Sequence, residues 1–125
     1  MSNVKPTSSG RGGLSDVHLS QVKRFLDPLC VPHPEARVRD QLRYGYRVEG
    51  PAVVFFESRP RFEKPSEWLD HEIAKFRFTK STGQWSLYCP FRDLKWRAYQ
   101  PLPHAADLAE LVAELRRDPT GIFFG

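Results

Sequence analysis

The clearest structural signal in the chain is the octapeptide QLRYGYRV, residues 41–48. Its side chains fall into two alternating sets, one apolar or aromatic and one polar or glycine: Leu42, Tyr44, Tyr46 and Val48 against Gln41, Arg43, Gly45 and Arg47. Successive side chains of a strand point to opposite faces of its sheet. The period of two therefore predicts a strand with one buried face and one open face.

Similar signals follow along the chain and predict an antiparallel meander of five strands. The turn at residues 49–51 precedes a nearly continuous apolar strand over 52–57. The alternating segment 71–80 pairs across the Gly83 turn with a strand that contains Trp85, Leu87 and Cys89. Residues 94–99 alternate again and are expected to form the fifth strand. Residues 58–70 read as a long surface loop, anchored by Phe62 and Trp68.

One helix is predicted before the meander and a second one after it. Ser15 is a suitable N-cap for the first, and apolar residues follow at helical spacing until Pro28 ends it. A second helix is expected to begin near His104, and the apolar segment 122–124 is expected to fold back onto the core. The predicted fold class is α+β: helix, five-stranded antiparallel meander, helix, in two layers with the helices on one face of the sheet.

Length and composition set further limits. With 125 residues, of which 40% are hydrophobic, the chain is expected to form a single domain over 14–125, preceded by a polar, disordered tail at 1–13. No apolar run approaches the ~20 residues of a membrane-spanning helix, so an integral membrane protein is not expected. Cys30 and Cys89 lie far apart and belong to no metal-binding pair, which is typical of free thiols in the reducing cytoplasm.

Four blocks of the sequence resemble a bacterial family described only as domain of unknown function 3024. They are residues 39–50 (RDQLRYGYRVEG), the hairpin from 74–76 (AKF) to 85–88 (WSLY), residues 93–96 (DLKW) and the closing 121–125 (GIFFG). The likeness runs from about residue 14 to the end, with the blocks in order. It implies a small, stand-alone bacterial cytoplasmic protein. It carries over no activity, cofactor or catalytic residue.

The positive charge of the chain suggests one binding hypothesis. The formal net charge is +4, and residues 37–100 hold thirteen Lys and Arg against eight Asp and Glu. If the alternation holds, the open sheet face gathers cations and aromatic rings from four strands: Arg43, Arg47, Lys75, Arg77, Tyr88, Lys95, Arg97 and Tyr99. Such a face can hold phosphates and stack unpaired bases. We therefore expect a non-catalytic module that binds DNA or RNA; ordinary solvated positions on a two-layer protein are the competing interpretation.

Two other functions are compatible with the sequence. A protein-interaction adaptor or a homodimeric structural protein would use the loop aromatics Phe62 and Trp68. A metal-dependent hydrolase would draw on a second set of side chains: Glu57, Glu63, Asp70, His71, Glu72 and Lys75. Glu72 and Lys75, however, have opposite parity and do not fit the acidic-x-Lys core of a nuclease. No cofactor, bound metal or catalytic residue is expected.

Overall fold

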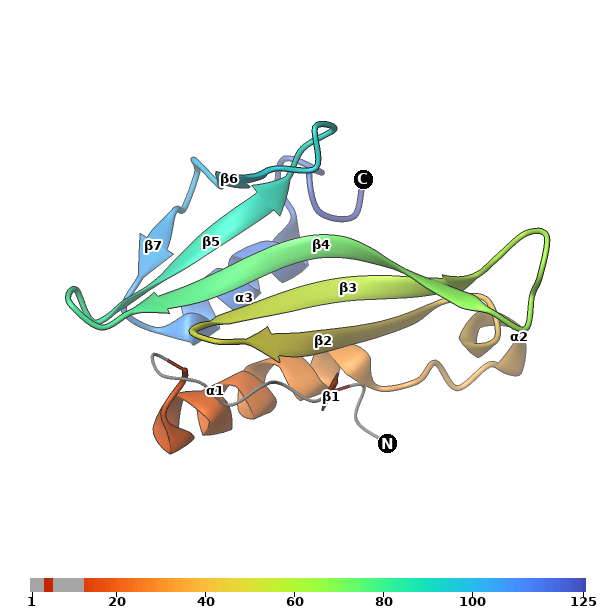
Figure 1. Cartoon of the computed structure of the whole chain (residues 1–125), viewed down its shortest axis with the longest axis horizontal. Helices are drawn as coiled ribbons and strands as arrows, with labels where there is room; N and C mark the ends of the chain where they lie inside the picture. The colour runs from red at the N-terminus through yellow and green to blue at the C-terminus, as the bar shows by residue number, and fades with distance from the viewer. Residues whose placement is uncertain (1–3, 6–12) are drawn as a thin grey trace.

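The computed structural model describes residues 4–5 and 13–125 (Figure 1). The helical elements are α1 (Asp16–Leu26), the 3-10 turn η1 (Asp27–Cys30), α2 (Ala36–Arg39) and α3 (Leu108–Arg117). The strands are β1 (Val4–Lys5), β2 (Arg43–Glu49), β3 (Ala52–Pro60), β4 (Trp68–Thr79), β5 (Gln84–Pro90), β6 (Trp96–Ala98) and β7 (His104–Ala105).

The sheet has the strand order β1-β2-β3-β4-β5-β6, with β7 paired to β5. Strands β2 to β6 form an antiparallel meander, which confirms the predicted α+β class. Most of the predicted tail lies outside the described residues. Within it, Val4–Lys5 forms β1 and pairs in parallel with Tyr46 and Arg47 of β2, a contact that the sequence pattern did not indicate.

Helices α1 and α3 cover one face of the sheet and share a single apolar core with it (Figure 1). Ser15 caps α1, because its hydroxyl accepts the backbone N–H of His18. Helix α1 buries Val22 and Leu26, and α3 buries Leu111 and Leu115, all at most 1% exposed. The face that receives these side chains is called the covered face below, and the opposite one the open face.

The hairpin of β3 and β4 is longer than predicted. The expected loop over 58–70 is wrong at both ends, because β3 continues to Pro60 and β4 begins at Trp68. The hairpin therefore projects beyond the helices (Figure 1). Phe62, at its tip, is 96% exposed, so the prediction that it anchors the loop is wrong. Trp68 is half-buried, with the Arg43 guanidinium 4.2 Å from its ring centroid.

A bulge at Ile73 divides β4 into two halves. Phe55 pairs with Ala74, whereas the next residue, Phe56, pairs with Glu72, so Ile73 has no partner of its own. Ile73 and Ala74 both join the apolar core. One extra residue reverses the parity of everything before it. Glu72 therefore lies on the open face, where uninterrupted alternation would have placed it on the covered one.

The last part of the chain differs from the prediction at one point. The second helix begins at Leu108, not near His104, because His104–Ala105 forms β7 against β5. Its C-cap, Asp118, has a positive φ of 43°, and its carboxylate accepts the backbone N–H groups of Phe123 and Phe124. This turn directs Phe123 into the core, where it is 7% exposed. The predicted return of the C-terminal segment is confirmed.

Candidate nucleic-acid interface

The open face of β2 to β5 holds five of the eight side chains predicted to share it. Arg47, Val54, Lys75 and Tyr88 form one row across four strands, each directly opposite the next. Arg43 shares a face with Arg47, and Arg77 shares one with Lys75, because residues two apart in a strand point the same way. The register thus brings Arg43, Arg47, Lys75, Arg77 and Tyr88 to one surface.

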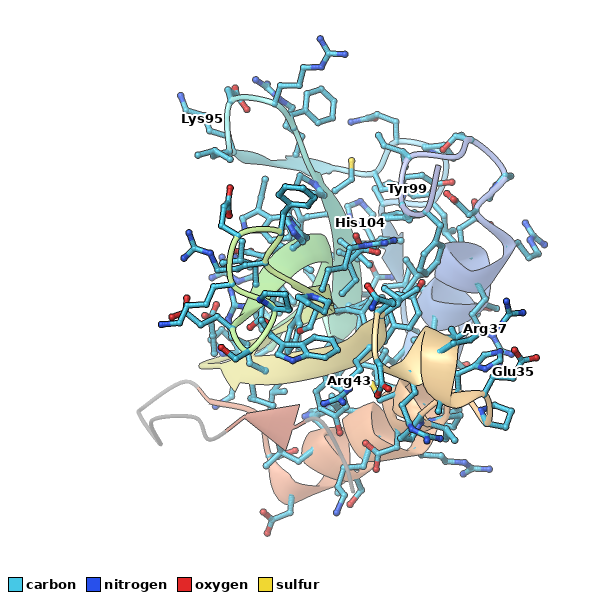
Figure 2. All side chains as sticks on the ribbon, turned by 90° about the vertical axis from the view of Figure 1, so that its right-hand side faces the viewer. Glu35, Arg37, Arg43, Lys95, Tyr99 and His104 are labelled. Atoms are coloured by element: carbon cyan, nitrogen blue, oxygen red, sulfur yellow. The ribbon has the colours of Figure 1, made fainter. Side chains whose placement is uncertain are left out.

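The other three predicted side chains do not join that surface. Arg97 lies opposite Cys89, a buried core residue, so its parity is that of the covered face. Tyr99 is 2% exposed and its hydroxyl donates a 2.7 Å hydrogen bond to Glu114 of α3. Lys95 precedes β6 and lies in the loop that leads to it. Figure 2 shows Tyr99 on the α3 side of the sheet and Lys95 at the tip of the loop.

Tyr99 explains why the predicted register of the fifth strand is wrong. Its ring packs on Phe123 at 4.9 Å between centroids, and its hydroxyl satisfies a buried carboxylate that Arg117 also binds at 2.7 Å. Burial, and then the bond to Glu114, raise the pKa of Tyr99. A tyrosine can serve as a core residue when its hydroxyl has such a partner, and here that partner comes from α3.

Arg97 is held by its own loop. It donates a 2.7 Å hydrogen bond to Asp93, and its guanidinium lies 4.9 Å from the Phe91 ring centroid. The backbone N–H of Lys95, and then Arg97, lower the pKa of Asp93. These contacts stabilise the turn between β5 and β6 and do not direct Arg97 toward the open face.

Two tryptophans enter the open face in place of the missing residues. Trp96 pairs with Pro90, and its neighbour Ala98 pairs with Tyr88, so Trp96 shares a face with Tyr88. The Lys75 ammonium lies 5.9 Å from the Trp96 ring centroid. Trp68 is the second, under Arg43. The sequence WRAY over 96–99 alternates whichever face is inward, so periodicity alone could not have identified Trp96.

Arg47 is engaged by acidic neighbours on both sides. It donates to Glu49 at 2.8 Å and lies 3.2 Å from Glu72, which the bulge has brought to this face. Burial opposes the charge, but the two carboxylates raise the pKa of Arg47 above its usual value. Its guanidinium also lies 6.0 Å from the Phe56 ring centroid. Arg47 therefore serves mainly to cover β3 and has little charge to offer a ligand.

Lys75 and Arg77 differ from Arg47 in their surroundings. Among residues 4–5 and 13–125, no carboxylate lies within ion-pair distance of either side chain. Both come from the second half of β4: Lys75 lies opposite Tyr88 and near Trp96, and Arg77 lies opposite Ser86, two residues from Tyr88 along β5. The part of the open face with available positive charge is thus the β4–β6 platform, defined here as Lys75, Arg77, Tyr88 and Trp96.

The carboxylates considered for a metal site have separate partners. Glu57 pairs with Arg59 at 3.2 Å, Asp70 accepts from Ser58, and Glu72 pairs with Arg47. Within the described part of the chain, no three His, Cys, Asp or Glu residues come together as metal ligands would. Both cysteines are buried and free. Burial raises the pKa of the Cys89 thiol.

Comparisons with known proteins match one family. The family model called Domain of unknown function (DUF3024) matches residues 14–125. No curated protein and no solved structure matches the chain. Across residues 4–5 and 13–125, none of the helices is both long and apolar enough to cross a lipid bilayer. Since the match takes in nearly the whole sequence and all four quoted blocks, the chain belongs to the DUF3024 family, a domain of unknown function.

Proposed function

We propose that this protein is a non-catalytic module that binds single-stranded nucleic acid on the β4–β6 platform. The observation that carries the proposal is the position of Lys75 opposite Tyr88 and 5.9 Å from the Trp96 ring centroid, with Arg77 on the same face. Within the described residues, neither cation has an acidic partner and no helix covers this face. We also propose a cytoplasmic location, with which two buried free thiols are compatible.

The chemistry of the platform suits an unpaired strand. Bases stack on aromatic side chains irrespective of sequence, since every base has a π face, and Tyr88 and Trp96 supply two such rings. Lys75 lies beside both rings and Arg77 follows on the same face of β4, so the two cations can neutralise phosphates that the stacked bases bring near the sheet. At the far end of the open face, the stacked pair of Arg43 and Trp68 offers a further contact for a longer strand.

A charge-matched pair of double variants tests the cationic half of the proposal. Lys75→Ala with Arg77→Ala removes two charges from the platform, whereas Lys23→Ala with Arg116→Ala removes two exposed charges from α1 and α3. Fluorescence anisotropy with a labelled single-stranded oligonucleotide gives the affinity at several salt concentrations. The platform variant should bind more weakly and its salt slope should fall by about 0.7 for each lost phosphate contact.

Two results contradict this part of the proposal. One is the absence of salt-dependent binding by the natural sequence. The other is an equal loss of affinity in both double variants, because only net charge would then matter.

The aromatic half is tested by Trp96→Ala beside Trp96→Phe. Stacking on one base contributes roughly 1–3 kcal/mol, so the alanine variant should bind about 5- to 150-fold more weakly while the phenylalanine variant stays close to the natural sequence. Equal affinities for all three proteins would remove Trp96 from the site.

The hairpin tip supports a second candidate function, that of a protein-interaction adaptor. Phe62 is 96% exposed there, far from the platform, and Leu94 is 92% exposed in the β5–β6 loop. Trp68 is a weaker candidate because Arg43 already covers its ring. Analytical ultracentrifugation of the natural protein and of Phe62→Ser tests self-association: a dimer that Phe62→Ser dissociates favours this function, and two monomeric proteins count against the homodimer.

A further inference from the structure

A cavity of about 540 Å³ lies at the outer edge of β2, apart from the β4–β6 platform. Its floor is apolar, with Leu29, Cys30, Leu42 and Tyr44, and two arginines, Arg39 and Arg43, line it. Its volume falls within the roughly 300–1,000 Å³ typical of sites for small organic ligands. We call it the β2-edge cavity.

The course of the chain explains why this place is left open. The helical layer ends at Cys30, and the extended connector 31–34 then leads away to α2 before the chain returns at β2. In the described part of the chain, β1 pairs with Tyr46 and Arg47, toward the middle of β2. Val31, which lines the cavity from the connector, is 71% exposed. Apolar surface is thus available on both sides of the recess.

The charged side chains that line the cavity are Arg39 and Arg43, while the carboxylates of Asp27 and Glu57 lie near the lining residues Cys30 and Tyr44. None of the described residues that line it is Asp or Glu. Arg39 is held in place, since its Nη1 donates to the carbonyls of His33 at 3.2 Å and Pro34 at 3.4 Å, and Arg43 Nε donates to the Arg39 carbonyl at 3.1 Å. A guanidinium carries five N–H donors, so these bonds leave donors for an anion.

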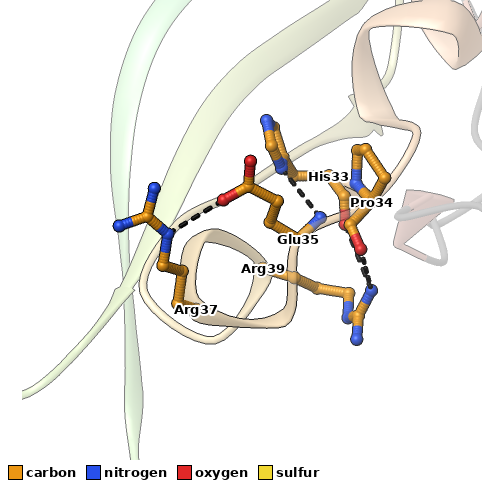
Figure 3. A network of polar contacts seen from close by, with 5 residues as sticks. All are labelled: His33, Pro34, Glu35, Arg37 and Arg39. Carbon is orange, nitrogen blue, oxygen red and sulfur yellow. Dashed lines mark hydrogen bonds and ion pairs between the residues drawn. The ribbon is translucent and has the colours of Figure 1, made fainter.

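The neighbouring Arg37 provides a natural contrast. It comes from the same short helix, but it pairs with Glu35 at 2.8 Å, is 84% exposed and does not line the cavity. Figure 3 shows Arg37 and Arg39 leaving α2 in opposite directions. Two arginines of one helix thus differ in the feature that matters, which is access to the apolar recess.

We propose that the β2-edge cavity binds a small hydrophobic carboxylate, with its apolar body against Leu29, Cys30 and Leu42 and its carboxylate between Arg39 and Arg43. The floor suits an apolar body because burial, followed by the nearby Asp27, raises the pKa of the Cys30 thiol to about 12, so the thiol stays neutral. Guanidinium–carboxylate hydrogen bonds are among the stronger polar contacts. This site shares no residue with the β4–β6 platform, although its Arg43 is also the partner of Trp68 in the outer contact proposed for a longer strand.

Isothermal titration calorimetry with decanoate, kept below its micelle concentration, tests the proposal on the full chain. Decanoate should bind saturably at one site, whereas acetate, which lacks the chain, and decyltrimethylammonium, which carries the opposite charge, should not. Removing a charged hydrogen-bonding partner costs about 1.5–3 kcal/mol, so Arg39→Ala should weaken decanoate binding at least tenfold. Arg37→Ala should leave it within about twofold of the natural sequence.

A cavity-filling variant separates ligand binding from folding, because Arg39 also holds the connector. Val38→Trp should abolish decanoate binding while oligonucleotide affinity and the thermal transition stay unchanged. Lys75→Ala with Arg77→Ala should keep decanoate binding intact. The proposal is overturned if decanoate does not bind saturably, if decyltrimethylammonium binds as tightly, or if Arg37→Ala loses as much affinity as Arg39→Ala.

Discussion

The two faces of the sheet reach similar burial by different means. On the covered face, Phe55 is 1% exposed beneath the helices and the C-terminal segment, with ring contacts to Tyr44 and Phe124. On the open face, Val54 and Phe56 are 1% and 3% exposed although none of the helices in the described residues lies over them. Long charged side chains from the flanking strands contribute to the cover, since Arg47 and Lys75 lie on either side of Val54 and the Arg47 guanidinium lies 6.0 Å from the Phe56 ring centroid. Burial of a strand residue therefore does not reveal what buries it.

The largest expected effect comes from a pair of neighbouring substitutions on β3. Phe55→Ala should lower the free energy of unfolding by about 3–5 kcal/mol, the usual cost of removing a well-packed core ring. Phe56→Ala should cost clearly less, because the flexible Arg47 stem and water can occupy the space. Urea denaturation of both variants measures the difference. Equal losses would mean that the arginine cover is as rigid as the helical one.

The next effect concerns pH and belongs to the covered layer. Burial, and then Asp27, raise the Cys30 pKa from 9.0 to about 12 in the folded protein. Below pH 9 both states keep the proton, so Cys30 contributes no pH dependence there. Above pH 9 the unfolded chain loses it first, and stability falls by about 1.4 kcal/mol per pH unit until the folded thiol also ionises near pH 12.

Replacing Cys30 with alanine should remove this contribution. The free energy of unfolding, measured by urea denaturation between pH 8.5 and 10.5, should fall less steeply in Cys30→Ala than in the natural sequence. Part of the slope should remain, because burial also raises the pKa of Tyr44, Cys89 and Tyr99. Parallel curves for the two proteins would show that the Cys30 thiol is more hydrated than its packing indicates.

The stability contributed by one tyrosine hydroxyl should differ between the two faces. Tyr99→Phe removes a donor from Glu114, which is itself only 7% exposed, and should cost about 1–3 kcal/mol. Tyr88→Phe on the open face should stay within about 0.5 kcal/mol of the natural sequence. Thermal denaturation of the two variants checks this. A reversed order of stability would return Tyr99 to the open face.

The smallest effect tests the ion pair that covers β3. Arg47 and Glu72 are 24% and 41% exposed at their side chains and lie 3.2 Å apart. A double-mutant cycle with Arg47→Met and Glu72→Gln should give a coupling energy of at most about 1 kcal/mol, since partly exposed ion pairs are weakened by water and salt. A larger value would show that this part of the open face is less hydrated than its exposure suggests.

The meander could be predicted from sequence where a strand alternates regularly and the helices cover its apolar side. In β2, apolar or aromatic residues alternate without interruption with a set that is charged apart from Gly45, and the helices select the apolar set, so the predicted face of Arg43 and Arg47 agrees with the structure. The same holds for Lys75 and Arg77, which follow the bulge in the regular half of β4.

The positions of the remaining site residues depend on tertiary contacts, which strand alternation does not indicate. Nothing in the local pattern indicates that Ile73 is an extra residue, so the arrival of Glu72 beside Arg47 was unforeseeable. At the end of β6, either Trp96 or Tyr99 could have faced the core. Tyr99 does so, and its hydroxyl bonds to Glu114 of α3. Strand parity is a local property, but its direction is decided by tertiary partners.

The bulge at Ile73 also determines how the outer part of the hairpin responds to mutation. Ile73 is the position that the register with β3 skips, so both halves of β4 stay in phase with β3. A single-codon deletion of Ile73 would join Glu72 directly to Ala74 and leave Trp68, Asp70 and Glu72 on the open face. A mutation that made the strand regular while keeping Ile73 would instead send every residue from Trp68 to Glu72 to the other side, so the chemistry of the outer arm depends on the bulge and not on the residue that fills it.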